Sequence, residues 1–355
     1  MVAERVKLTE EQQSAVEQIV KLEKQVQTLG GYAGTGKSTA ITTLTDIFPK
    51  FSVCAYTGKA ANVLRRKGIP NASTIHSLIY KPVSQPGREV VFQKRHPDEV
   101  SFSGFIIDEA SMVSKEIHND LLSFDRPIVY VGDHGQLEPV GADDFNLMRE
   151  PDYTLETIHR NAGEIAEFAQ HLRCGGEASS WENRLGGQVS VIDYDKLGDA
   201  GTSESDQIIC AFNRTRTMLN AVVRGHLKLP AAMLVVGDRI ICLQNDREHG
   251  LFNGMQGKIT EIDTVKRRLS FSDEDDKLYV DIPYHREGFG SDKVPKRTFG
   301  VVPFDWAYCV TCHKMQGSEA ARVLVLEERC GLWSHQRWAY TAASRAKENL
   351  TWVVQ

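Results

Sequence analysis

The sequence predicts an α/β protein in which parallel sheets are covered by helices. Two observations carry this prediction. Short apolar runs alternate with stretches whose apolar residues recur at helical spacing, and the apolar runs end at polar clusters. Such alternation is typical of strand–helix–strand units with crossover helices. The length of 355 residues indicates two or more lobes.

The first predicted element is a helix at residues 8–20, with the sequence LTEEQQSAVEQIV. Thr9 and Gln12 have the spacing of a capping box, in which each side chain bonds to the backbone of the other residue. Four strands are predicted to follow, at residues 26–29, 51–56 (FSVCAY), 102–107 (FSGFII) and 127–132 (PIVYVG). Ligands of parallel sheets gather beyond the carboxyl ends of the strands, where the polar clusters lie.

Two segments interrupt the alternation. Residues 80–101 carry three prolines around an apolar VVF run, and we expect a hairpin that projects from the first lobe. Residues 236–300 contain short strand-like runs between acidic and glycine-containing turns, which predicts a small all-β insert.

The remaining residues divide into two lobes. The first is assigned to residues 1–79 and 102–150, and the second to residues 151–235 and 301–355. Core strands of the second lobe are predicted at QIICAF, residues 207–212, and ARVLVL, residues 321–326.

The composition is that of an ordinary globular protein, with 41% hydrophobic and 25% charged residues. No apolar run approaches the roughly 20 residues that a membrane helix needs, and the first residues do not resemble a signal peptide, so we expect a cytoplasmic protein. The net charge of −5 argues against a uniformly basic surface but allows a local basic groove. The 7 scattered cysteines fit a reducing compartment, and the pair Cys309 and Cys312 is interpreted as packing residues.

A glycine-rich stretch, GYAGTGKST at residues 31–39, has the full G-x-x-x-x-G-K-[ST] spacing between a predicted strand and helix. The backbone N–H groups of such a loop wrap a phosphate chain at the positive end of a helix. Lys37 would reach the β- and γ-phosphates, and the Ser38 hydroxyl would bind Mg²⁺. The predicted nucleotide-binding residues of the loop are Gly31, Tyr32, Ala33, Gly34, Thr35, Gly36, Lys37, Ser38 and Thr39.

Two further polar groups follow predicted strands. Asp108 and Glu109 come directly after FII, and a carboxylate there can hold Mg²⁺ while its neighbour orients or deprotonates an attacking water. The alternative is that they cap a helix. Gln136, in VGDHGQLEPV, follows the next strand and is suited to sense a γ-phosphate, although the stretch could equally be a simple turn.

A set of motifs in a fixed order runs along nearly the whole chain and resembles the superfamily 1B DNA helicases, above all the RecD-like, Dda-like and Pif-type branch. The motifs are LTEEQ, GYAGTGKST, AYTGKAA, STIH, IIDEAS, GDHGQLEP, LETIHR, TCHKMQGSE and YTAASRA. The resemblance implies two RecA-like P-loop NTPase lobes, with a strand-separating pin at 80–101 and an SH3-like module at 236–300.

The same resemblance assigns roles to single residues. Gln12 would recognise adenine, with its capping role as the alternative. Arg160 and Arg345 would reach the phosphates from the second lobe and stabilise charge on the transferred phosphoryl group, although both could be surface arginines. Glu319 matches a position near the nucleotide sugar.

The DNA-facing positions that the resemblance implies are Thr57, Lys59, Thr74 and His76 on the first lobe, and Asn253, Thr311, His313, Lys314 and Gln316 on the second. Hydroxyl, amide and lysine groups position phosphates without reading base sequence. Each could instead be structural, and Asn253 in particular matches a recurrent turn. Phe92 is the candidate for a ring that stacks on the last base pair, and its alternative is a hydrophobic anchor of the hairpin.

We therefore expect an ATP- and Mg²⁺-dependent helicase that moves 5′-to-3′ on single-stranded DNA and opens single-strand/duplex junctions. Its expected setting is replication, recombination or repair in a bacterium or a phage-infected cell. It would work as a monomer, alone or beside single-strand-binding or recombination proteins. Two alternatives stay open: a translocase that strips proteins from single strands, and a non-motor subunit that uses ATP as a switch.

Overall fold

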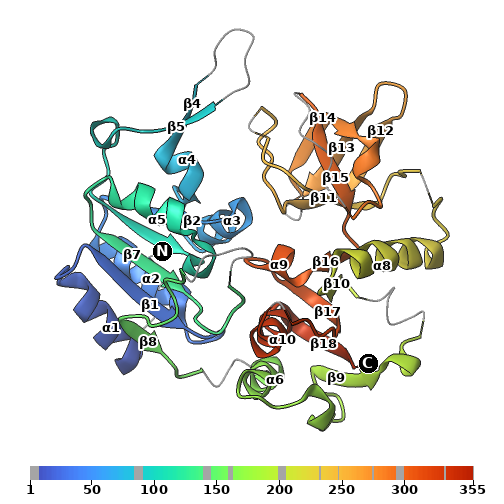
Figure 1. Cartoon of the computed structure of the whole chain (residues 1–355), viewed down its shortest axis with the longest axis horizontal. Coiled ribbons are helices and arrows are strands. Elements are labelled where there is room, and N and C mark those ends of the chain that lie inside the picture. The colour runs from blue at the N-terminus through green and yellow to red at the C-terminus, as the bar shows by residue number, and fades with distance from the viewer. Residues whose placement is uncertain are drawn as a thin grey trace, which may run out of the picture. The chain divides into compact units, whose positions relative to one another are not determined.

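The computed structural model describes residues 8–83, 91–138, 145–158, 163–198, 205–231, 233–246, 248–273, 276–292, 300–331 and 333–354. The chain divides into two compact units, Met1–Ala162 and Gly163–Gln355, which Figure 1 shows in blue to green and in green to red. Each unit is described by itself.

Unit 1 is built on a six-stranded sheet in the order β3-β2-β6-β7-β1-β8, and every pair of neighbours is parallel. The strands are β1 (Val26–Gly31), β2 (Phe51–Ala55), β3 (Ser73–Thr74), β6 (Gly104–Asp108), β7 (Ile128–Gly132) and β8 (Tyr153–Leu155). The helices are α1 (Glu10–Val20), α2 (Lys37–Ile47), α3 (Gly58–Arg66), α4 (Ile75–Ile79) and α5 (Lys115–Leu122).

The two faces of this sheet carry separate cores, because side chains alternate along each strand. On β7, Val129 and Val131 belong to the cluster that includes residues of α1, α2 and α3. Ile128 and Tyr130 belong to the cluster that includes residues of α4 and α5. The structure therefore confirms the predicted α/β class, with helices on both faces of a parallel sheet.

The predicted hairpin contains two antiparallel strands, β4 (Tyr80–Val83) and β5 (Val91–Lys94). Asp120 on α5 bonds to both of them. Its carboxylate accepts a hydrogen bond from the Tyr80 hydroxyl and lies 2.9 Å from the Lys94 ammonium. The base of the hairpin is thus fixed to the body of unit 1.

Unit 2 contains a five-stranded parallel sheet in the order β16-β10-β17-β18-β9. The strands are β9 (Val189–Asp193), β10 (Gln207–Cys210), β16 (Cys309–Thr311), β17 (Ala320–Leu326) and β18 (Ala346–Val354). The helices are α6 (Gly163–Arg173), α8 (Asn213–His226), α9 (Cys312–Met315) and α10 (His335–Ala343). Cys309 and Cys312 are buried free thiols, in agreement with their interpretation as packing residues.

A closed barrel of five strands is inserted into unit 2 between β10 and β16. Its strands are β11 (Arg239–Cys242), β12 (Gln256–Asp263), β13 (Arg268–Asp273), β14 (Leu278–His285) and β15 (Val302–Trp306). Only the pairing of β14 with β15 is parallel. The barrel encloses its own hydrophobic core, which includes Ile259, Phe271 and Phe304.

The structure corrects two predicted boundaries. The first lobe does not end at residue 150, because β8 pairs with β1. The Asp152 carboxylate accepts hydrogen bonds from the backbone N–H and hydroxyl of Thr28, at 3.0 and 2.9 Å, which fixes β8 at the edge of this sheet. The β insert likewise does not end at residue 300, because β15 closes the barrel through Trp306.

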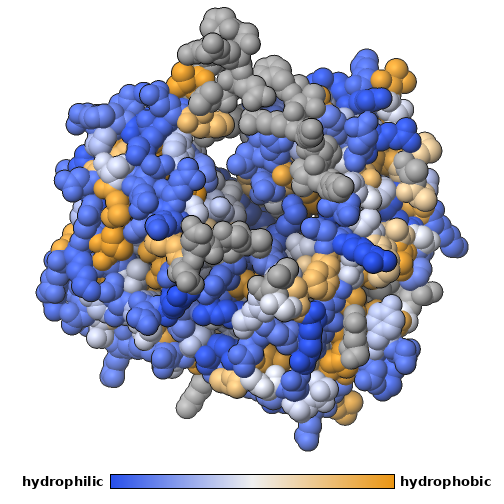
Figure 2. Space-filling view, viewed as in Figure 1, coloured by the Kyte–Doolittle hydropathy of each residue, from blue (hydrophilic) through white to orange (hydrophobic). Residues whose placement is uncertain are grey.

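None of the helices in the described parts of the chain has the length and the hydropathy that crossing a membrane requires. On the face drawn in Figure 2, hydrophilic residues predominate and hydrophobic ones form small patches.

Candidate nucleotide-binding site

The predicted phosphate loop joins β1 to α2. Gly34 and Gly36 have φ values of 81° and 82°, a left-handed conformation that glycine adopts without strain. Gly36 is the N-cap residue of α2, so the loop delivers its backbone N–H groups to the start of that helix. A Cβ atom on Gly31 would lie 2.7 Å from the Thr35 hydroxyl oxygen, so the tight path of the loop requires glycine here as well.

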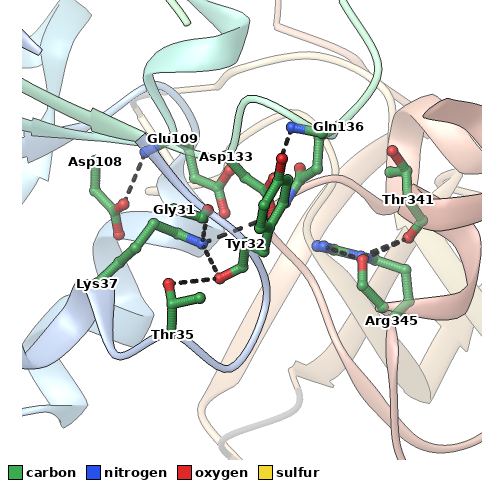
Figure 3. Close-up of polar contacts among 12 residues, drawn as sticks. Gly31, Tyr32, Thr35, Lys37, Asp108, Glu109, Asp133, Gln136, Thr341 and Arg345 are labelled. Carbon is green, nitrogen blue, oxygen red and sulfur yellow. Dashed lines mark hydrogen bonds and ion pairs between the residues drawn. The ribbon is translucent and has the colours of Figure 1, made fainter. Parts of the chain in front are cut away.

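Lys37 lies inside the loop (Figure 3). Its ammonium donates hydrogen bonds to the carbonyl oxygens of Gly31 and Tyr32, at 2.6 and 2.9 Å. The Thr35 hydroxyl bonds to the same Tyr32 carbonyl at 2.9 Å. The lysine is therefore held at the concave side of the loop, where a phosphate chain would pass.

Gln12 connects α1 to the loop. The capping box predicted from its spacing with Thr9 is confirmed, since both reciprocal hydrogen bonds are present. The buried Gln12 amide also donates to the Thr35 carbonyl at 3.0 Å. The residue thus braces the phosphate loop, and its proposed contact with adenine stays a prediction.

Asp108 and Glu109 stand at the carboxyl end of β6. The Asp108 carboxylate accepts a hydrogen bond from the Glu109 N–H at 2.9 Å (Figure 3). Burial raises the pKa of Asp108 above its ordinary value, while that hydrogen bond and the charges of Lys37 and Lys67 oppose the rise. Glu109 has a φ of 55°, and its side chain makes no capping hydrogen bond to the following 3-10 helix. Left-handed backbone in a residue other than glycine is a form of strain that concentrates at functional sites.

Asp133 is a site residue that the sequence analysis missed. It is buried, and its carboxylate oxygen Oδ2 lies 3.7 Å from the Lys37 ammonium. The same oxygen accepts a hydrogen bond from the Gln136 amide at 3.1 Å, and Oδ1 accepts one from Gly135 N–H at 2.9 Å. Asp133 therefore links the loop lysine to the predicted γ-phosphate sensor. Its signal in the sequence is its place directly after β7, in the same GDHGQ stretch as Gln136.

The predicted DNA-facing residues of unit 1 have local roles in the structure. Thr57 and Thr74 are N-cap residues of α3 and α4, and their hydroxyls accept backbone hydrogen bonds at 3.1 and 3.2 Å. The exposed His76 ring lies near Tyr56 and Tyr80, with centroid distances of 6.2 and 5.5 Å. Phe92 is 41% exposed.

In unit 2, Arg345 is held by three oxygens. Its guanidinium donates to the Thr341 carbonyl at 3.0 Å, the Ser318 carbonyl at 3.3 Å and the Ser344 hydroxyl at 2.9 Å (Figure 3). Glu319 is exposed and pairs with Lys347 at 3.2 Å. Arg160 lies outside the described residues.

Four of the remaining predicted positions of unit 2, Thr311, His313, Lys314 and Gln316, lie in α9 or directly beside it. The His313 ring packs edge-on against Trp333 at a centroid distance of 5.2 Å, and burial lowers its pKa. Burial, followed by the nearby Arg216 charge, lowers the pKa of Lys314. Thr311 and Gln316 are buried. Asn253 is exposed in a turn, where its N–H donates to the Asn245 side chain at 2.7 Å.

A phosphate loop at the carboxyl end of a parallel sheet, with acidic side chains after β6 and β7, defines the class of P-loop nucleotide-binding proteins. Comparison with known families agrees with this class. Residues 7–192 match the model of the AAA domain, and residues 306–353 match that of the UvrD-like helicase C-terminal domain.

Individual relatives narrow the class. The RecD2 helicase of Deinococcus radiodurans is 27% identical over 379 residues, covering 96% of this chain and 48% of the relative. The Dda helicase of phage T4 is 29% identical over 188 residues, covering 47% of this chain and 43% of Dda. The chain thus spans about half, or less, of the length of these curated relatives.

Among solved structures, the Bacteroides Pif1 helicase in complex with ADP-AlF3 and single-stranded DNA has the same fold. Its TM-score is 0.63 at 20% identity, with 98% of this chain and 92% of that chain covered. The chain belongs to the AAA domain family, and it is similar to the RecD-like and Dda helicases.

Proposed function

We propose that this protein is an ATP-dependent DNA helicase that moves 5′-to-3′ along single-stranded DNA. The observation that carries the proposal is the connected set of Lys37, Asp133 and Gln136 beside Asp108 and Glu109, which places a phosphate-binding cation next to acidic groups. The names of the relatives RecD2 and Dda, both DNA helicases, support the same activity.

The residues present fit Mg²⁺. Ser38 is the second residue of α2, and Asp108 is the last residue of β6. A hydroxyl oxygen and a carboxylate oxygen are therefore available on neighbouring segments. Oxygen ligands from one or two side chains, completed by phosphates and waters, are what Mg²⁺ prefers. Ser38 and Asp108 would hold the metal, which when bound neutralises charge on the phosphates.

The other residues of the site have separate tasks in this proposal. Lys37 binds the phosphates from the concave side of the loop. Glu109 orients and deprotonates the attacking water, and Gln136 senses the γ-phosphate through the hydrogen bond it shares with Asp133. Arg345 and Arg160 supply positive charge to the phosphates, and Gln12 contacts the adenine.

DNA binding is proposed for the motif residues outside the nucleotide site. In unit 1 the exposed His76 and the partly buried Lys59 would contact the sugar–phosphate backbone, as would His313, Lys314 and Gln316 in or beside α9 in unit 2. The exposed Phe92 on the anchored hairpin β4–β5 would stack on the last base pair of a duplex. The barrel would act as the SH3-like module that accompanies such a hairpin, and the protein would act as a monomer on single-strand/duplex junctions.

The decisive experiment is unwinding of duplexes that carry either a 5′ or a 3′ single-stranded tail, measured with ATPase activity in the same samples. We expect unwinding of the 5′-tailed substrate only, and ATP turnover that rises when single-stranded DNA is added. Stimulated turnover without unwinding would instead identify a translocase. Turnover that does not respond to DNA would identify an ATP-switch subunit and contradict the proposal.

A further inference from the structure

Lys67 follows α3 and contacts a predicted metal ligand far from it in sequence. Its ammonium donates a hydrogen bond to the Ser38 hydroxyl oxygen at 2.8 Å. Lys67 therefore contacts one of the two side chains that are assigned to Mg²⁺, although it belongs to none of the motifs that define the family resemblance.

The backbone around Lys67 is well fixed. Its N–H donates to the carbonyls of Val63 and Leu64 at 3.1 Å each, and Gly68 with a φ of 95° ends the helix after it. α3 itself begins directly after β2, and β2 pairs with β6 so that Ala55 lies beside Asp108. Lys67, at the other end of α3, reaches the Ser38 hydroxyl from a fixed backbone, while its side chain stays exposed.

We propose that Lys67 and Mg²⁺ are alternative cations at the Ser38 hydroxyl. The inference rests on the proposed nucleotide site. An ammonium hydrogen-bonded to the Ser38 oxygen and a divalent cation bound to it would repel each other at close range. Mg²⁺ must therefore displace Lys67 when it binds with a nucleotide. Without the metal, Lys67 supplies positive charge near the phosphates.

In this arrangement the two lysines of the site differ in their relation to the metal. Lys37 lies inside the phosphate loop and is held by two of its carbonyl oxygens, so its place there does not depend on the metal. Lys67 competes with the metal, so it raises the concentration of Mg²⁺ that nucleotide binding requires. Lys67 is then a positioning residue that makes nucleotide loading depend on free Mg²⁺.

The test is equilibrium binding of a fluorescent ADP analogue to the wild type and to Lys67→Ala, in EDTA and across a series of Mg²⁺ concentrations. In EDTA, Lys67→Ala is expected to bind the nucleotide more weakly. In the Mg²⁺ series, the same variant is expected to reach half-maximal binding at a metal concentration about two- to fivefold lower, the range set by an exposed charged contact.

Two control variants complete the design. Lys67→Arg keeps the charge and should behave as the wild type in EDTA. Lys50→Ala removes a lysine from the loop that precedes the opposite end of β2, and should change neither measurement. Circular dichroism of each variant verifies that it is folded.

The outcomes are distinct. Opposite shifts in EDTA and in Mg²⁺ support the proposal. A shift in the same direction under both conditions would make Lys67 an ordinary phosphate ligand, and no shift would leave its contact with Ser38 without effect; either result overturns the inference. Failure of the wild type to bind nucleotide at all would instead contradict the proposed function.

Discussion

Arg224 on α8 and Asp238, directly before β11, form an ion pair in which both side chains are almost fully buried. The Arg224 guanidinium also lies over the Trp306 ring, 4.3 Å from its centroid, and donates to the carbonyls of Pro230 and Met233. A second buried pair, Arg216 with Asp305, joins the same helix to the end of the barrel. The first and the last strand of the barrel, β11 and β15, are therefore both held to α8 by a buried ion pair.

Arg224→Met is expected to lower the free energy of unfolding by about 3–5 kcal/mol, because it leaves the Asp238 charge buried without its partner. Denaturant unfolding followed by tryptophan fluorescence measures the change. The control is Arg268→Met, which breaks the more exposed pair with Asp281 and should cost less than about 1 kcal/mol. Equal losses in the two variants would contradict a special role for the buried pair.

Asp133→Asn is expected to lower ATP turnover by roughly tenfold or more, since hydrogen bonds to charged groups contribute about 1.5–3 kcal/mol. The change removes the charge that faces Lys37 at 3.7 Å and alters the acceptor for the Gln136 amide. Steady-state kinetics measure turnover and KM separately. A variant with wild-type turnover would show that Asp133 does not organise the site.

Glu109→Gln is expected to bind ATP but hydrolyse it very slowly, because an amide has the shape of the carboxylate without its basicity. Nucleotide binding and turnover are measured on the same preparation. Glu116→Gln, at an exposed position of α5, removes the same charge nearby and should leave both unchanged. Normal hydrolysis by Glu109→Gln would refute its assignment as the base.

Asp120→Ala is expected to reduce duplex unwinding while leaving DNA-stimulated ATPase nearly unchanged, since it releases β4 and β5 from α5. The anchor also predicts a pH effect. Burial raises the pKa of Asp120, but hydrogen bonds from Lys94 and Tyr80 lower it more, so the pKa lies below its ordinary value of 3.8. The stabilisation is therefore complete above that value and is lost as the pH falls below it.

Acid unfolding of Asp120→Ala and of the wild type measures this pH effect. The difference in stability between the two proteins should shrink only at pH values below the ordinary pKa of the carboxyl. A difference that instead shrinks as the pH rises would contradict the anchor.

Phe92→Ala distinguishes the two interpretations of this ring. As a stacking residue, Phe92 contributes roughly 1–3 kcal/mol to contact with a base, so the variant should unwind duplexes more slowly and keep its thermal stability. As a hydrophobic anchor of the hairpin, it would instead lower thermal stability. The 41% exposure of Phe92 favours the first outcome.

Short-range features of the fold could be predicted because their causes lie within a few residues. The capping box of Thr9 and Gln12 depends on a spacing of three, and it is present as predicted. The glycines of the phosphate loop occupy positive φ values at Gly34 and Gly36, which their residue type permits. Strands β2, β6, β7, β10 and β17 lie within two residues of the predicted runs at each end.

Longer-range contacts escaped prediction. β8 has only three residues, too few for a recognisable pattern of apolar residues. It belongs to the first sheet because Asp152 bonds to Thr28. Asp133 could be seen as polar but not as the partner of Lys37, because that contact depends on the order in which β7 and β1 pair.

The sequence alone determined the fold class, the phosphate loop and the acidic pair at the end of β6, since each is a pattern of neighbouring residues whose backbone geometry is local. The tertiary structure decided which side chains meet: Lys67 with Ser38, Asp120 with the hairpin, and Arg224 with Asp238. These contacts join separate elements, and they depend on strand order and helix packing, which the free energy of the whole fold sets and no short stretch of sequence encodes.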